Sequence, residues 1–191
     1  MSDLDLGMND HLTTEFVWQD EQEYQRGKVL SAQQLDEVEV FGRYLDVDDD
    51  GICYRTLPGT HPDKGAYFNR GTSRNHFAGY TEKSADYVDN MERLTKKFIN
   101  SVRWLPEPEI QQTKNRAQLG LIFFGTSSHP ISEAVEQLKE HGLIADCLRI
   151  KAFPFHQSIA QFIAEHSCNN KQVFVIEQNR DAQMKSLLVN E

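Results

Sequence analysis

QLGLIFFGTSSHPISEAVEQLKEHGLIADCLRI, residues 118–150, is the stretch that decides the fold of this chain. Its first part, 118–126, is an apolar run rich in Leu, Ile and Phe, which predicts a buried strand. The next part, 127–142, has Pro130 where a helix begins, an apolar side chain at every third or fourth position, and a glycine at its end. The run 143–150 is short and apolar again and predicts a second strand.

The same alternation continues to the C-terminus. Residues 153–167 begin with a proline turn and become an amphipathic helix, 172–178 predict a third strand, and 181–189 a final helix. Strands that alternate with helices in this way form parallel sheets with right-handed crossovers. We therefore predict an α/β fold with three layers, in which helices cover both faces of the sheet.

The N-terminal half is less regular. Residues 31–45 predict a helix that opens with a capping box formed by Ser31 and Gln34. Residues 81–105 carry the longest helical pattern, which two prolines terminate. The segment 106–117 is polar and is interpreted as a connector between the two halves.

The loop between these helices, residues 46–82, contains a cluster of acids. In DVDDDG, residues 46–51, three aspartates and the glycine fall where a helix–loop–helix calcium site needs them. The twelfth position, however, holds Leu57 instead of the bidentate carboxylate. We predict an acidic turn with no metal, in which Asp side chains accept backbone amides and Gly51 has a positive φ. We also expect Asp48→Asn with Asp50→Asn to leave stability unchanged or slightly higher, because the acids repel one another.

Composition excludes several classes of function. The formal net charge is −9, which argues against nucleic acid or an anionic membrane as partner. No apolar run is long enough to span a bilayer. Three widely spaced cysteines, Cys53, Cys147 and Cys168, are typical of a reducing compartment, so we expect a cytoplasmic protein. Three are also too few for an iron–sulfur cluster, which generally needs four.

Two further motifs admit more than one interpretation. GTSSHP, residues 125–130, lies between a strand and a helix, where it is either an anion site or an ordinary turn. Glu177 and Arg180 follow the third strand, at the edge where α/β proteins often bind ligands. A structural ion pair or a helix cap explains them equally well. Spacing alone assigns no chemistry to the chain.

Six segments carry a resemblance that runs along nearly the whole chain in the same order. They are DLDLGMND (3–10), RTLPGTHP (55–62), KGAYFNRGTSRN (64–75), YTEKSADYVDNMERLTKKF (80–98), RIKAFPFH (149–156) and VFVIEQNRDAQMKSLL (173–188). Together they resemble the α subunit of 2-oxoacid:ferredoxin oxidoreductases of the 2-oxoglutarate type. The second and sixth segments are the most specific.

The resemblance implies a domain organisation in which the chain is the C-terminal portion of the subunit, a fragment without the catalytic domain. Residues 1–30 resemble the exit from a missing domain that binds the pyrimidine of thiamine diphosphate. Residues 31–105 resemble a helical, loop-rich insertion, and 106–191 a βαβαβα unit similar to the C-terminal domain of transketolase. We expect 31–191 to form one structural domain.

The implied reaction is oxidative decarboxylation of a 2-oxoacid to an acyl-CoA. The complete enzyme uses thiamine diphosphate, Mg²⁺ and an iron–sulfur cluster, with coenzyme A as co-substrate, and passes electrons to ferredoxin. Its other parts are the remainder of the α subunit and the β subunit. None of the family's cofactor motifs lies in this chain, so we expect the chain alone to bind no cofactor or metal and to be inactive.

The resemblance also points to four residues that line the active site or bind substrate, although none is assigned a catalytic role. Arg70 and Arg74 would attract an anionic oxoacid or a phosphate of coenzyme A. Asn75 and His76 follow, at a place where the family has Asp or Asn and then an acid, and His76 departs from that pattern. The alternative to a portion of an oxidoreductase is that the whole chain is a stand-alone α/β module for interaction or small-ligand binding.

Overall fold

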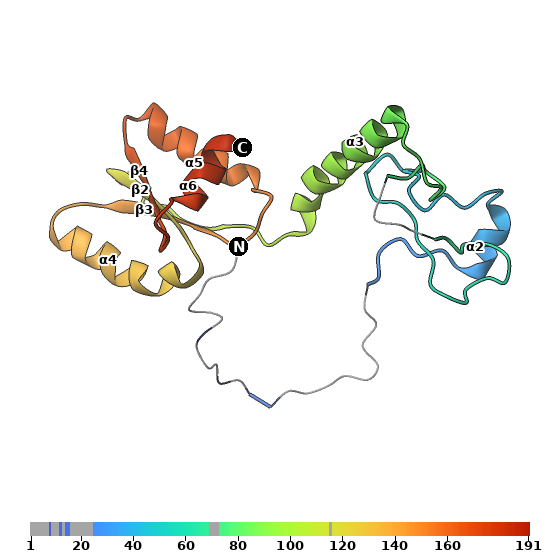
Figure 1. The fold of residues 1–191 in the computed structure, drawn as a ribbon. Coiled ribbons are helices and arrows are strands. Elements are labelled where there is room, and N and C mark those ends of the chain that lie inside the picture. The colour runs from blue at the N-terminus through green and yellow to red at the C-terminus, as the bar shows by residue number, and fades with distance from the viewer. Residues whose placement is uncertain (1–7, 9–11, 13, 16–24, 69–72, 115) are drawn as a thin grey trace. The chain divides into compact units, whose positions relative to one another are not determined.

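The computed structural model describes residues 8, 12, 14–15, 25–68, 73–114 and 116–191. The chain divides into two compact units, and the boundary falls between Arg103 and Trp104 (Figure 1). We call them the N-terminal unit, within Phe16–Arg103, and the C-terminal unit, Trp104–Glu191. Most of 1–30, the predicted exit segment, lies outside the described residues. The expectation of one domain over 31–191 stays a prediction.

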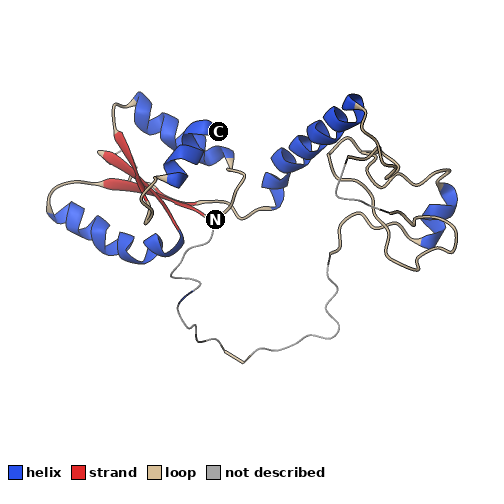
Figure 2. Cartoon of the chain, viewed as in Figure 1, coloured by secondary structure: helices blue, strands red, loops and turns tan. Residues whose placement is uncertain are grey.

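A four-stranded sheet forms the centre of the C-terminal unit, in the order β1-β3-β2-β4 (Figures 1 and 2). The central strand β2 (Leu119–Phe124) runs parallel to both β3 (Ala145–Ile150) and β4 (Gln172–Ile176). All three strands were predicted from their apolar runs, and their parallel direction is confirmed. Strand β2 contains no charged residue, because helices cover both of its faces.

The prediction of a polar connector over 106–117 is wrong in part. Strand β1 (Glu109–Gln111) pairs with β3 in the antiparallel direction, with Ile110 opposite Leu148. All three β1 side chains are exposed. The strand therefore lacks the apolar run by which the other strands were predicted. Backbone pairing with β3 and the contacts of Glu109 with two cations on the neighbouring segment hold it in place.

Helices cover both faces of the sheet, as the three-layer prediction requires (Figure 1). On one face α4 (Ser128–Glu140) packs Ile131, Val135 and Leu138 against the cluster of Leu121, Phe123, Ala145 and Cys147. On the other face α5 (Gln157–Cys168) and α6 (Gln183–Asn190) contribute Ile159, Phe162 and Met184 to a second cluster with Ile122, Leu148 and Ile150. The α/β fold class is confirmed.

Two of the buried polar residues in this unit, Asp146 and His166, lie next to each other. Asp146 on β3 and His166 on α5 are each at most 5% exposed, and their Oδ2 and Nε2 atoms are 3.3 Å apart. The Nδ1 of His166 lies 2.8 Å from the carbonyl oxygen of Phe162, to which it can only donate. The other Asp146 oxygen accepts from the amide and hydroxyl of Thr113 at 2.7 and 2.8 Å. The Asp146 carboxylate therefore ties the segment after β1 to the sheet, whereas the Nε2 atom of His166 makes no hydrogen bond within the described chain.

The N-terminal unit contains two α-helices and long ordered loops. α2 (Ala32–Glu37) begins with the predicted capping box of Ser31 and Gln34. The prediction that this helix extends to residue 45 is wrong: Val38 is already extended. The ammonium of Lys64 lies 2.9–3.3 Å from the carbonyl oxygens of Leu35, Asp36 and Val38 and satisfies the helix end.

The second helix of this unit is α3 (Ser84–Asn100), followed by a 3₁₀ turn over Ser101–Trp104. It confirms the predicted helix over 81–105, although the α-helix begins three residues later and gives way to the 3₁₀ turn after Asn100. Its sequence has an apolar stripe at helical spacing, and Tyr87, Met91, Leu94 and Phe98 on that stripe are all 40–55% exposed. None of the helices in the described residues is both long enough and apolar enough to cross a membrane.

Candidate functional site: a basic pocket in the N-terminal unit

The acidic turn over 46–51 is built as the sequence predicted. The carboxylate of Asp46 accepts the amides of Asp50 and Gly51 at 3.1 and 2.9 Å. Gly51 has φ +82°, which a residue with a side chain rarely adopts. No group of three or more His, Cys, Asp or Glu side chains suited to a metal ion occurs among the residues described.

The expectation that Asp48→Asn with Asp50→Asn leaves stability unchanged or slightly higher took account of repulsion alone, whereas the structure places a cation between these two acids. The ammonium of Lys28 lies 2.6 Å from Asp48 and 2.8 Å from Asp50, and Asp50 also accepts the amide of Ile52 at 2.8 Å. Asp49 pairs with Lys96 on α3. The Lys28 hydrogen bonds lower the pKa of both Asp48 and Asp50. Partial burial disfavours the charge of Lys28, but its two carboxylate partners outweigh this and raise the pKa.

This turn is packed against α3. A Cβ at Gly51 would lie 2.4 Å from the amide nitrogen of Lys97 and 2.9 Å from the carbonyl oxygen of Arg93. Arg93 donates to the Gly51 carbonyl at 3.3 Å, and Asn100 donates to that of Asp50 at 3.0 Å. The missing side chain of Gly51 thus lets the turn lie directly on the helix backbone and fixes the position of Arg93 and Lys97.

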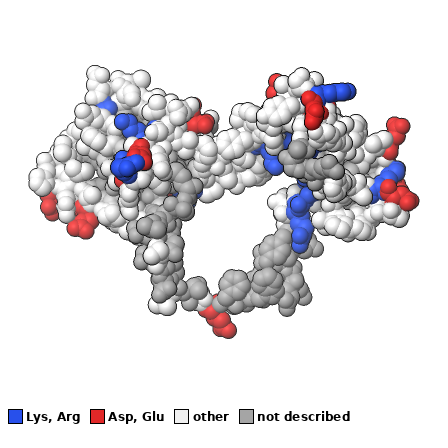
Figure 3. All heavy atoms as spheres, in the orientation of Figure 1, with Lys and Arg blue, Asp and Glu red and all other residues white. Residues whose placement is uncertain are grey.

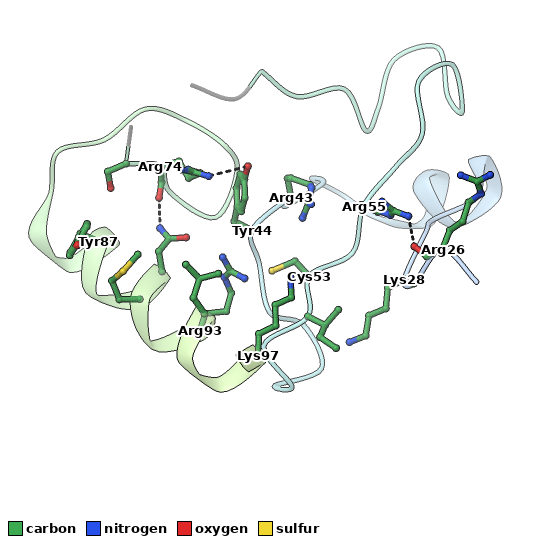
Figure 4. A pocket seen from close by; sticks show the side chains of 16 residues that line it. Arg26, Lys28, Arg43, Tyr44, Cys53, Arg55, Arg74, Tyr87, Arg93 and Lys97 are labelled. Atoms are coloured by element: carbon green, nitrogen blue, oxygen red, sulfur yellow. Dashed lines mark hydrogen bonds between the residues drawn. The ribbon is translucent and has the colours of Figure 1, made fainter. Parts of the chain in front are cut away.

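Beside this contact lies a pocket of about 570 Å³ (Figure 4). Its walls come from α3 and from four loop stretches, 26–28, 43–44, 52–55 and 73–74. We call it the basic pocket, because seven of its lining residues are cationic: Arg26, Lys28, Arg43, Arg55, Arg74, Arg93 and Lys97. No Asp or Glu occurs among the described residues that line it. The chain as a whole contains 29 acidic and 20 basic residues, so the excess of cations in this pocket is opposite to the net charge of the chain.

Tyr44 holds three of the guanidinium groups together. Its ring is buried, and the guanidinium carbons of Arg43, Arg74 and Arg93 lie 5.2, 5.0 and 5.9 Å from the ring centre. The quadrupole of an aromatic ring attracts cations at such distances. The Nε atoms of Arg43 and Arg93 are buried and have no hydrogen-bond partner within the described chain. Two donors beside the pocket are thus left unsatisfied within the described chain.

The opposite end of the pocket is held by backbone pairing. Arg55 and Lys28 belong to neighbouring segments: the Arg55 amide donates to the Lys28 carbonyl at 2.9 Å, and the Leu30 amide to the Arg55 carbonyl at 2.9 Å. The Arg55 guanidinium donates to the carbonyl of Arg26 (Figure 4). Between the two ends lies Cys53, whose thiol pKa is raised by burial. The thiol is therefore neutral at pH 7 and adds no negative charge.

The predicted site residues divide between the pocket and its supporting turn. Arg70 lies outside the described residues. Arg74 lines the basic pocket, where its Nη1 is 3.4 Å from the Tyr44 hydroxyl. The side chain of Asn75 accepts the amides of Phe77 and Gly79, and His76 contacts Asp89 on α3. These are contacts of a folded turn, and the substrate role of all four residues stays a prediction.

The segment RTLPGTHP has a structural role in this unit. The Nδ1 atom of His61 accepts the amides of Asp63 and Lys64 at 3.0 and 2.8 Å, so its Nε2–H points to Asp36 at 3.0 Å. The Thr56 hydroxyl donates to the carbonyl of Gly65 at 2.6 Å. These bonds fix the long loop and join it to α2.

The motifs in the C-terminal unit also have structural partners. Glu177 is a helix cap: its carboxylate accepts the amides of Met184 and Lys185 at 2.9 and 3.2 Å. Burial disfavours its charge, but these amides and the Asn179 side chain outweigh burial and lower the pKa of Glu177. Arg180 pairs with Asp181 on the surface. In GTSSHP, Gly125–Ser127 form a 3₁₀ turn that leads into α4.

Figure 3 shows the charged side chains on one face of the molecule, where acidic and basic groups lie in small clusters among uncharged surface. The basic pocket differs from such mixed clusters because it is concave and because its described charged lining residues are all cations.

No family model matches the chain. Its structure is similar to that of a 2-oxoglutarate:ferredoxin oxidoreductase from Magnetococcus marinus, solved with 2-oxoglutarate, coenzyme A and succinyl-CoA bound. The TM-score is 0.64 at 22% sequence identity, over 80% of this chain and 26% of that chain. This likeness establishes a shared fold. The chain spans about a quarter of the length of that protein chain.

Sequence reasoning found only Arg74 among the seven cations of the pocket. The other six come from separate stretches between residues 26 and 97, and no motif joins them. One signal was present, since the longest predicted helix carries Arg93 and Lys97 one turn apart, but such pairs are common on solvated helix faces.

Proposed function

We propose that this chain is the C-terminal portion of the α subunit of a 2-oxoacid:ferredoxin oxidoreductase, of the type that oxidises 2-oxoglutarate. The observation that carries the proposal is the fold likeness over 80% of the chain. Neither unit alone makes up that share, so the likeness takes in residues of both. The six quoted segments, spread from residue 3 to residue 188, support the same assignment.

In the complete enzyme this portion would contribute subunit contacts and part of the active-site wall. The basic pocket would receive an anionic group of a reactant, because a guanidinium matches the geometry of carboxylate and phosphate. 2-Oxoglutarate carries two carboxylates and coenzyme A several phosphates. The C-terminal unit, with its transketolase-like order of strands and helices, would be the scaffold.

The residues of this chain do not fit the cofactors of such an enzyme. The cysteines are three, and Cys147 is buried within β3, far from a cluster-binding arrangement of four thiolates. The basic pocket is lined by cations, which repel Mg²⁺. We propose that thiamine diphosphate, Mg²⁺ and the iron–sulfur cluster belong to the remainder of the α subunit and to the β subunit, with ferredoxin as electron acceptor. The three free cysteines support a cytoplasmic location.

The test uses the enzyme assembly that contains this chain. We expect ferredoxin reduction that depends on a 2-oxoacid and on coenzyme A. In that assembly Arg43→Gln with Arg93→Gln should raise KM for an anionic reactant on the order of 10- to 100-fold, since a charged hydrogen bond contributes about 1.5–3 kcal/mol. Arg149→Gln, on the C-terminal unit and paired with Glu109, is the matched control and should leave KM unchanged. An assembly that reduces ferredoxin with no 2-oxoacid would refute the proposal.

A second candidate is a stand-alone module that binds a small anion. It is favoured by one observation: every described residue that lines the basic pocket belongs to the N-terminal unit. A chain that occurs in cells without oxidoreductase subunits, as shown by its mass after gentle purification, would favour this candidate.

A further inference from the structure

We infer that the basic pocket binds an organic ligand that carries two or more phosphoryl groups, in preference to a dicarboxylate. The inference rests on the anion-receiving role proposed above and names the class of ligand. Three features of the pocket carry it: the number of cations, their division into two groups, and an apolar wall beside them.

The charge of the pocket exceeds what a dicarboxylate neutralises. Of the seven cations, Lys28 is already balanced by Asp48 and Asp50 of the acidic turn. Of the others, Arg43 and Arg93 have Nε atoms with no hydrogen-bond partner within the described chain, and the described residues that line the pocket include no carboxylate. Like charges held at the edge of a low-dielectric pocket repel one another strongly unless an anion lies between them. A ligand with two or more phosphoryl groups supplies more negative charge, and more acceptor oxygens, than 2-oxoglutarate.

The cations form two groups at opposite ends of the pocket (Figure 4). Arg43, Arg74 and Arg93 surround Tyr44, each within 6 Å of the ring centre. Arg26 and Arg55 are joined to each other at the other end, by the hydrogen bond from the Arg55 guanidinium to the Arg26 carbonyl. Two separate groups suit a ligand with more than one anionic centre, and the buried Nε donors of Arg43 and Arg93 lack an acceptor within the described chain.

The third feature is apolar. Tyr87, Met91 and Leu94 line the pocket from α3, and each is 40–55% exposed. The volume of about 570 Å³ is in the usual range for an organic ligand and is much more than a single phosphate fills. An aromatic and aliphatic wall next to cations suits a phosphorylated ligand with a ring or alkyl portion, such as a nucleotide.

The test is calorimetric titration of the 191-residue chain with inorganic pyrophosphate, ADP, coenzyme A and 2-oxoglutarate, at fixed ionic strength. We expect pyrophosphate to bind about tenfold or more tightly than 2-oxoglutarate, and ADP or coenzyme A to bind more tightly than pyrophosphate because of the apolar wall. Preference between ADP and coenzyme A then distinguishes the two sources of the phosphoryl groups. Arg43→Gln with Arg93→Gln should weaken pyrophosphate binding about tenfold or more, and Arg149→Gln should leave it unchanged.

Two results would overturn the inference. The first is 2-oxoglutarate binding as tightly as pyrophosphate, or no pyrophosphate binding at all. The second is pyrophosphate binding that the double variant does not weaken while its α3 amides keep their normal hydrogen exchange, which would place the anion elsewhere. Arg93→Lys keeps the charge and serves as a second variant if the double variant unfolds; it should lose less affinity than Arg93→Gln. Because titration needs no catalysis, its outcome is independent of whether the assembly oxidises a 2-oxoacid.

Discussion

Gly51→Ala is the substitution that most directly tests how the acidic turn positions the basic pocket. The new Cβ would lie 2.4 Å from the Lys97 nitrogen and 2.7 Å from its Cα, distances that require the backbone of α3 or the turn to move. The left-handed backbone at φ +82° adds a cost of about 1–2 kcal/mol for any residue with a Cβ. Overpacking against fixed atoms costs about 1–3 kcal/mol. We therefore expect the N-terminal unit to lose about 2–5 kcal/mol.

Gly59→Ala separates these two terms. Gly59 has a similar φ of +80°, but no atom lies within 4 Å of an added Cβ. It should show the backbone cost alone, about 1–2 kcal/mol. The difference between the two variants is then the contact with α3, about 1–3 kcal/mol.

Hydrogen exchange of the α3 amides, residues 84–100, is the appropriate assay, because it reports the local stability of this helix in a chain with two compact units. A difference of about 1.4 kcal/mol is a factor of 10, so α3 should exchange on the order of 10- to 100-fold faster in Gly51→Ala than in Gly59→Ala. Equal exchange rates in the two variants would refute the packing of the turn on the helix. The same rates in β2 of both variants would show that the effect is local.

Further predictions concern both units. Gly120→Ala should destabilise the C-terminal unit by about 1–3 kcal/mol, measured by urea unfolding, because the new Cβ would lie 3.0 Å from Phe162 and 3.1 Å from His166; an unchanged midpoint would contradict this packing. Asp146→Ala should cost about 1–3 kcal/mol, since it leaves the Thr113 amide and hydroxyl without their acceptor, whereas Thr113→Val removes only the hydroxyl hydrogen bond and should cost about 1 kcal/mol. Glu177 has a lowered pKa, so its stabilisation is present above the ordinary carboxyl value near pH 4.5 and is lost as pH falls through the folded value. The melting temperatures of wild type and Glu177→Gln should therefore differ at pH 7 and converge once the pH falls below the folded pKa. Asp48→Asn with Asp50→Asn should lower stability, because it removes both partners of Lys28, and a higher melting temperature would show that repulsion among the acids dominates.

The sequence by itself determined the α/β architecture of residues 118–191. Each strand is a short apolar run, because the sheet is covered on both faces, and each helix has an apolar side chain at every third or fourth position, because it is buried on one face. Both are local sequence patterns. The cap at Ser31 and the turn at Gly51 were also determined locally, because their hydrogen bonds join residues within five positions. The resemblance of six segments pointed to the same fold that the comparison structure has.

Tertiary structure decided the remainder. Strand β1 exists because Glu109–Gln111 meet the edge of β3, and α2 ends at Glu37 because Lys64, far along the chain, satisfies its last carbonyls. The basic pocket is the clearest case. Charge is read from a sequence as an average, and the average here is acidic, but an electrostatic site depends on distances in space. Only the path of the loop across α3 brings guanidinium groups from residues 43, 74 and 93 around one tyrosine ring.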